Sequence, residues 1–476
     1  MAQRVLIAGS GVAAVEAVLA LRHLGGHGFE IELLAPSHAL EHRPASVAAP
    51  FGLGAPSPLD LHELARRYAI TLVAGRLTGV DVDARTACLS SGDDRAYDYL
   101  LVAVGAQPEP ALDGSLTFRG PADVPMVEWV LAEVARGHRR QLVVVVPPGA
   151  TWSLPAYELA IMARTELRGV PDATVTLVTS EREPLRIFGE AAGAALRELL
   201  VEREINLRTE ARAAHVTDHM LWLECGDAVA ADTVISLPRL VGPAIAGLPS
   251  SDEGFLPTDA HGYVMGAERV LAAGDVTTFP VKQGGLATQQ ADAAAATIAH
   301  ELGAAVEPRP FAPVLRGLLL TGGAPLYLRA ELDPRDARRT GDARHRHLAG
   351  EVSSRALWWP PGKVAGRYLA PYMSTARPVT LGEEPLVDRV PGASDADLAE
   401  RDAALELALL VADEDAAVGD LRQALHALDA AAALAGGVLP AVYAERRDLW
   451  LARLGSACES APRNVHGLPR GASLAS

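Results

Sequence analysis

A glycine-rich turn between an apolar strand and an Ala-rich helix opens the sequence. Residues 4–8 are apolar enough for a buried strand, and Gly9-Ser-Gly-Val-Ala-Ala14 follows them directly. Gly9 lacks a Cβ and can adopt the tight turn. Gly11 lets the backbone approach a pyrophosphate, and Ala14 allows helix and strand to pack closely. Because the first N–H groups of such a helix attract phosphates, the sequence predicts a dinucleotide-binding unit here.

The second strand of this unit departs from the usual pattern. An acidic residue is expected about 20 residues after the glycines, where it holds a ribose hydroxyl. The strand at residues 30–34 is instead followed by Ala35. Glu32 has the wrong phase on the strand, so Ser37 is the candidate for the ribose contact.

A second nucleotide-binding segment lies far along the chain. An apolar strand at residues 270–273 ends in Gly274-Asp275, and a carboxylate there can accept hydrogen bonds from ribityl hydroxyls. The segment Pro280-Val-Lys-Gln-Gly-Gly285 then opens an Ala-rich helix that we expect to extend to about Leu302. The positive end of that helix would face a flavin pyrimidine ring, which carries negative charge when reduced. The two segments together predict an FAD site.

Two further motifs resemble one enzyme family. Tyr97-Asp-Tyr-Leu-Leu-Val-Ala-Val-Gly-Ala-Gln-Pro108 resembles the strand that closes the FAD domain in the pyridine nucleotide-disulfide oxidoreductase superfamily, and Glu41-His-Arg-Pro44 resembles its Arg-Pro element. The subgroup it is most similar to includes type II NADH dehydrogenases, sulfide:quinone oxidoreductases and the flavin subunit of flavocytochrome c sulfide dehydrogenase. The resemblance covers about residues 3–375. With the glycine motifs it implies that FAD is held by Gly9, Gly11, Ala14, Ser37, Arg43, Gly105, Gly274, Asp275, Lys282 and Gln283.

The expected fold is α/β, with two nested Rossmann-type domains, an α+β third domain and a C-terminal helical extension. The FAD-binding domain comprises residues 1–115 and 245–305, interrupted by an NAD(P)-binding-like domain at 116–244. Residues 306–377 form the third domain. We expect an acidic helical extension at 378–455, with helices at 395–413, 419–435 and 440–453, and a disordered tail at 456–476.

The second domain has lost most of its glycine motif. Its first strand is followed by Pro147-Pro-Gly-Ala-Thr-Trp152, in which Gly149 is the one glycine left. The prolines remove N–H donors that a phosphate needs, and Trp152 is bulky where close approach is required. Glu181, after the second strand, could still meet a ribose, but the sequence favours a surface carboxylate there. The Pro-Pro-Gly element resembles the degenerate second domain of sulfide-oxidising relatives, which pass electrons without nicotinamide.

Lysine usage singles out two positions. The chain has 43 basic residues, and only Lys282 and Lys363 among them are Lys. Lys and Arg are not interchangeable at a tight or titrating site. Lys282 directly precedes the helix aimed at the flavin, where we expect it to stabilise the anionic reduced form. Glu158 matches the place where the superfamily often puts a Glu near the flavin. Lys282 and Glu158 are therefore the candidate catalytic residues, and a pairing between them is a hypothesis.

Composition limits the cellular location and the classes of partner that we expect for this chain. The net charge of −16 argues against nucleic-acid binding, and no apolar run reaches the roughly 18–20 residues that span a bilayer. The first strand starts by residue 4, so no signal peptide is expected. The expected location is cytoplasmic, with a peripheral contact at the inner face of the membrane and a homodimer left open. Cys88, Cys225 and Cys458 form no CxxC pair, so disulfide chemistry is not expected. We predict no metal site.

Trp358 and Trp359 adjoin Lys363 and Arg367. Aromatic residues with basic neighbours suit an interfacial anchor, a quinone pocket or a lid, and packing at a domain seam is an equal alternative. The sequence as a whole predicts an FAD-dependent oxidoreductase that passes electrons to a quinone or protein acceptor from a small-molecule or protein donor other than NAD(P)H in the standard pose. One alternative is an NAD(P)H:acceptor oxidoreductase with a remodelled nicotinamide site. Another is a non-turnover flavin-binding scaffold acting through the C-terminal helices.

Overall fold

A computed structural model describes residues 3–53, 58–333, 350–374 and 387–388, with five single residues beyond them. The chain divides into a unit at residues 1–392 and a second unit at 393–476. In the second unit the described residues are Leu425, Leu428, Arg447, Trp450 and Leu451, all in helical conformation. The predicted extension and tail otherwise lie outside the described residues.

The first sheet joins strands from both ends of the FAD-binding domain. It has five parallel strands in the order β20-β9-β1-β2-β5. Their bounds are β20 Val270–Ala272, β9 Tyr99–Val102, β1 Arg4–Ala8, β2 Glu30–Ala35 and β5 Thr71–Ala74. The predicted nesting is confirmed at this sheet, because β20 enters it after the whole second domain has intervened.

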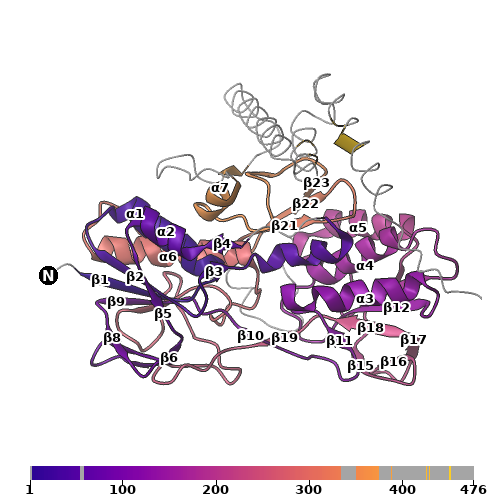
Figure 1. The fold of residues 1–476 in the computed structure, drawn as a ribbon, viewed down its shortest axis with the longest axis horizontal. Helices are drawn as coiled ribbons and strands as arrows, with labels where there is room; N and C mark the ends of the chain where they lie inside the picture. Colours follow the sequence, from indigo (N-terminus) through magenta and orange to yellow (C-terminus); the bar gives the residue numbers. More distant parts are fainter. Residues whose placement is uncertain are drawn as a thin grey trace, which may run out of the picture. The chain divides into compact units, whose positions relative to one another are not determined.

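Helices cover one face of this sheet and a small antiparallel sheet covers the other (Figure 1). Side chains alternate along β1, so that Val5 and Ile7 pack against the helices while Leu6 and Ala8 face the small sheet. The helices are α1 Val12–Gly25, α2 Leu61–Tyr68 and α6 Gly284–Glu301. The small sheet comprises β6 Leu77–Asp81, β7 Thr86–Leu89 and β8 Asp94–Ala96.

The second domain repeats this plan. Its parallel sheet has the order β11-β18-β12-β13-β14, with helices on one face and the antiparallel sheet β15-β16-β17 on the other (Figure 1). The strands are β11 Leu116–Thr117, β18 Thr233–Ser236, β12 Gln141–Val146, β13 Thr174–Thr179, β14 Asn206–Arg208, β15 Ala213–Thr217, β16 Met220–Leu223 and β17 Ala228–Ala230. The helices are α3 Val124–Ala135, α4 Leu154–Glu166 and α5 Glu190–Glu202.

Short elements connect the two Rossmann-type domains. Strands β10 Gln107–Glu109 and β19 Arg239–Val241 pair antiparallel where the chain leaves and re-enters the first domain. A 3₁₀ helix, Arg43–Phe51, places Val47 in the core of the second domain. Strands β3 Ala39–Leu40 and β4 Leu59–Asp60 form a further pair.

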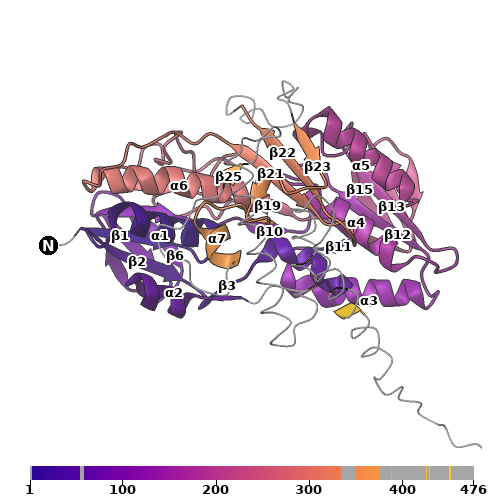
Figure 2. The same ribbon diagram turned by 90° about the horizontal axis from the view of Figure 1, so that it is seen from above.

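The third domain is an antiparallel sheet with a short helix. Strands β21 Val314–Leu319, β22 Leu326–Glu331 and β23 Glu351–Ser353 form the sheet, and β24 Trp358–Trp359 pairs with β25 Val387–Asp388. Helix α7, Leu369–Ser374, lies near α1 in both ribbon views (Figures 1 and 2). This arrangement confirms the α+β character of the third domain within the expected α/β fold.

Candidate FAD site

A cavity of about 930 Å³ runs along the carboxyl end of the first sheet and is shared by all three domains. Ligands of doubly wound sheets bind at this end. Nine of the ten predicted FAD-binding residues line the cavity. They are Gly9, Gly11, Ser37, Arg43, Gly105, Gly274, Asp275, Lys282 and Gln283. Ala14, the tenth, is fully buried between helix and sheet, which is the packing role expected of it.

The glycine turn leaves room for a ligand backbone to approach. Gly9 has φ +137°, and a Cβ there would lie 2.2 Å from the carbonyl oxygen of Ala103. An ideal Cβ on Gly11, by contrast, meets no atom within 4 Å. Gly9 is therefore required by the fold, whereas Gly11 faces open cavity, as a pyrophosphate site needs. The chain thus provides a cradle that fits FAD.

Asp275 lies near two positively charged side chains, Lys282 and Arg43. Gly274 has φ +84°, and a Cβ there would come within 3.2 Å of the Ala13 Cβ and 3.3 Å of the Ala287 Cβ. Burial raises the pKa of the Asp275 carboxyl, and the charges of Lys282 and Arg43 oppose that rise. The carboxylate therefore lies on the cavity wall beside two cations, where ribityl hydroxyls could reach it.

Lys282 is buried in the loop that precedes α6. Its ammonium donates to the carbonyl oxygen of Thr277 and lies 3.9 Å from the centre of the Phe255 ring. Burial lowers its pKa to about 8, opposed by the charges of Asp275 and Glu253. Gln283 caps α6, because its Oε1 accepts from Leu286 N–H at 2.8 Å. The hypothesis that Lys282 pairs with Glu158 is wrong, since its ammonium is held within its own loop.

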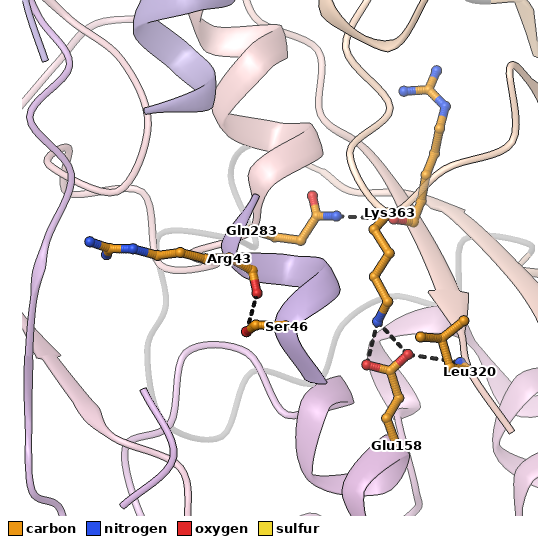
Figure 3. A network of polar contacts seen from close by, with 7 residues as sticks. Arg43, Ser46, Glu158, Gln283, Leu320 and Lys363 are labelled. Atoms are coloured by element: carbon orange, nitrogen blue, oxygen red, sulfur yellow. Dashed lines mark hydrogen bonds and ion pairs between the residues drawn. The ribbon is translucent and has the colours of Figure 1, made fainter. Parts of the chain in front are cut away.

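Glu158 pairs with the other lysine of the chain. It lies on α4 with no exposed surface, and Lys363 donates to both of its carboxylate oxygens (Figure 3). The Leu320 N–H also donates to Oε1, at 2.8 Å. Burial raises the pKa of Glu158, and the charge and hydrogen bonds of Lys363 oppose that rise. Lys363 lines the cavity, so a buried ion pair between the second and third domains borders the candidate site.

The sequence did not predict that Lys363 pairs with Glu158, although Lys363 stood out as one of only two lysines. It also missed His42, which stands in the Glu41-His-Arg-Pro44 motif. The buried Nδ1 of His42 has no hydrogen-bond partner. Burial, together with the charge of Lys363, lowers the pKa of His42 to about 4. His42 is therefore a neutral imidazole at physiological pH.

Trp358 belongs to the core of the third domain. It has no exposed surface, and its ring lies 5.2 Å from that of Tyr327 in an edge-on arrangement. Trp359 is partly exposed, and neither Trp lines the cavity. Packing is therefore the alternative that holds for Trp358, but inside the third domain and not at a domain seam. Within the described ranges, no helix is long and apolar enough to cross a membrane.

The sequence pattern of the pyridine nucleotide-disulphide oxidoreductases matches residues 3–297. The chain belongs to this family. Members use FAD, usually with NAD(P)H as the partner, and this member is an FAD-dependent oxidoreductase, which confirms the family, the cofactor and the enzyme class expected from the sequence.

Similar proteins in this family have different enzyme names. The chain is 32% identical over 333 residues to the ferredoxin reductase component of chlorobenzene dioxygenase from Cupriavidus sp. (strain PS12), covering 64% of this chain and 76% of that protein. It is 28% identical over 222 residues to an NADH dehydrogenase-like protein of Mycobacterium tuberculosis (strain ATCC 25618 / H37Rv), covering 43% of this chain and 54% of the relative.

A solved structure shares the fold. The sulfide:quinone oxidoreductase from Aquifex aeolicus superposes with a TM-score of 0.65, at 20% identity, over 74% of this chain and 87% of that one. At this identity the likeness concerns the fold alone.

Proposed function

We propose that this family member takes electrons from a donor other than NAD(P)H in the standard pose and passes them through FAD to a quinone or a protein carrier. FAD, when bound, supplies the two-electron chemistry, so that the donor loses two electrons and the acceptor gains them. The observation that carries the proposal is the hydrogen bonding of the Glu181 carboxylate in the second domain. This residue follows β13, where a nucleotide-binding domain places the acid that holds a ribose.

The Glu181 carboxylate is already bound by its own domain. It accepts hydrogen bonds from the Tyr157 hydroxyl at 2.6 Å, the Ser153 hydroxyl at 3.0 Å and the Thr179 hydroxyl at 3.1 Å. Tyr157 is fully buried. An adenosine ribose would have to compete with these donors, and any hydroxyl that it displaced would be left buried without a partner. This arrangement supports a second domain that has no standard nucleotide site.

The turn after β12 supports the same proposal. Pro147 and Pro148 have no N–H to offer a phosphate. Trp152, which lines the cavity, packs edge-on against Phe188 with ring centres 5.9 Å apart. A bulky indole thus occupies a place where a dinucleotide backbone would need close approach.

The Glu158–Lys363 pair gives the site a titratable group. Its position at the cavity suits holding a proton or a charge next to the reacting ring. Lys282 carries a second charge near Asp275. We assign both lysines and Glu158 to tuning the cofactor.

The second candidate function is NAD(P)H-dependent reduction of a protein carrier through a remodelled site. The 32% identity to a ferredoxin reductase component favours it. Thr151 and Pro155, which follow β12 in the second domain, also line the cavity. A nicotinamide ring could therefore contact this segment in a pose other than the standard one.

An anaerobic titration of the FAD-loaded protein with NADH and NADPH distinguishes the two. We expect the visible flavin absorption to persist with either nucleotide and to bleach with dithionite. Sulfide, a quinol and a reduced ferredoxin are then tested as donors. Rapid bleaching by NADH would overturn the proposal and support the alternative.

Two variants test whether Glu181 contacts a bound nucleotide. Glu181→Ala removes the carboxylate in question, and Glu183→Ala is the matched control, because Glu183 forms an exposed pair with Arg197. Under the proposal neither change affects the response to NADH. A weaker NADH affinity in Glu181→Ala alone would show that Glu181 contacts the ribose.

A further inference from the structure

A pair of carboxyl side chains lies where α1, α6 and the third domain meet. Glu16 on α1 has no exposed surface. Asp292 on α6 is within hydrogen-bonding reach of it. Asp292 is partly exposed as a residue, but its Oδ1 is buried. Two carboxylates side by side with so little access to water repel one another strongly, and the stable arrangement is one proton shared between them.

The surroundings of Asp292 favour this shared proton. Its Oδ1 is buried without a hydrogen-bond partner, which would be costly for a full carboxylate. Burial raises the pKa of Asp292 well above its usual range, and Glu16 adds to the rise, whereas the charges of Arg367 and Arg316 oppose it. Burial also raises the pKa of Glu16 to about 7.

Glu16 holds the segment of the third domain that leads into α7. Its carboxylate accepts hydrogen bonds from Tyr368 N–H at 2.8 Å and Leu369 N–H at 2.6 Å. Gly366 lies so close that a Cβ there would be 2.6 Å from Glu16 Oε2. The same segment begins with Lys363, which reaches the cavity and pairs with Glu158. Glu16 thus anchors the segment that carries Lys363.

We propose that Glu16 and Asp292 are positioning residues that share one proton, and that this proton keeps the segment Lys363–Leu369 docked so that the Lys363 ammonium stays at the cavity. The proposal goes beyond the function proposed above and holds whichever donor is used. Loss of the shared proton on raising the pH would leave two adjacent negative charges with little access to water, and the segment would be released to hydrate them.

The direction of the pH effect follows from the raised pKa values. A carboxyl whose pKa is higher in the folded protein stabilises the docked state below the unfolded value and loses that effect as the pH rises through the folded value. Other nearby groups do not titrate in this range. Burial raises the pKa of Tyr368 to about 12. His23, whose ring lies 5.0 Å from that of Tyr368, has a pKa lowered by burial and by Arg367.

Hydrogen exchange at the Tyr368 and Leu369 amides tests the proposal without measuring activity. In the full-length protein with FAD, we expect their protection, corrected for the intrinsic pH dependence of exchange, to fall about tenfold or more between about pH 6 and about pH 9. Asp292→Asn is the decisive variant, because its amide can donate permanently to Glu16. Its protection should not change with pH.

Further variants complete the design. Glu16→Gln mimics the protonated Glu16 and should also flatten the profile, with weaker protection because an amide oxygen is a poorer acceptor. Glu32→Gln is the control, since Glu32 is a buried carboxyl that pairs with Arg4 elsewhere in the domain, and its profile should match that of the original protein. Protection that does not depend on pH in the original protein, or an unchanged pH dependence in Asp292→Asn, would overturn the proposal. Neither result bears on the NADH titration.

Discussion

Lys363 lies 205 residues after Glu158 in the chain, yet its ammonium donates to both oxygens of that carboxylate (Figure 3). The pair connects α4 of the second domain to the loop before α7, and both side chains are almost entirely shielded from solvent. A buried pair of this kind is sensitive to the loss of one partner, because the other charge is left without compensation.

Replacing Lys363 by Met should therefore destabilise the protein by about 3–5 kcal/mol. The Glu158 carboxylate would keep only the Leu320 N–H as a donor. Urea unfolding measures the change. The double variant Glu158→Gln/Lys363→Met should recover part of the loss, and Arg212→Met, at the exposed Arg212–Glu224 pair, should cost about 0–1 kcal/mol. Equal losses in Lys363→Met and Arg212→Met would contradict the prediction.

Lys282 should give the unfolding free energy a distinct pH dependence. Its pKa is about 8 in the folded protein, below the usual value for Lys, so burial disfavours the charged form. The stability that this group contributes is present above the unfolded pKa and lost as the pH falls through about 8, up to roughly 3 kcal/mol in total. Comparing denaturation of Lys282→Met and the original protein between about pH 7 and about pH 10 isolates the effect. Parallel pH profiles for the two proteins would argue against it.

The two glycines of the first turn should respond differently to Ala. Gly9→Ala places a Cβ against a carbonyl oxygen at a φ of +137° and should cost on the order of 3 kcal/mol of stability. Gly11→Ala meets no protein atom, so the apoprotein should unfold as before while FAD affinity falls about tenfold or more. Circular dichroism and calorimetric FAD titration separate the two effects. Unchanged FAD affinity in Gly11→Ala would mean that the pyrophosphate lies elsewhere.

Replacing Trp358 should lower the stability of the protein and leave its binding to vesicles unchanged. Trp358→Ala empties a fully buried site and should cost about 3–5 kcal/mol. Trp358→Phe should cost less, because the buried indole N–H has no hydrogen-bond partner to lose. Thermal unfolding gives the stabilities, and co-sedimentation with vesicles tests for a membrane role. Reduced vesicle binding by the folded Phe variant would contradict a purely internal position.

Four strands of the first sheet, and most residues that line the candidate FAD site, could be predicted from the amino-acid sequence alone. Short-range rules were enough, because the glycine turn and the strand that ends in Gly274-Asp275 are local patterns. The nested order followed from the same motifs, since two parallel strands of one sheet can be recognised before the connection between them is known. The loss of the glycine motif in the proline-rich turn of the second domain could also be predicted, because it too is a local pattern.

Which charged side chains pair with one another could not be predicted from local patterns. Lys282 directly precedes α6, yet its ammonium donates to the carbonyl oxygen of Thr277, while Lys363 reaches Glu158 from another domain. Glu16 and Asp292 gave no signal in the sequence, because each looks like an ordinary polar residue of an Ala-rich helix. Ion pairing and shared protons depend on distances of a few ångströms between segments far apart in the chain. Those distances are set by how the domains pack, which no local pattern contains.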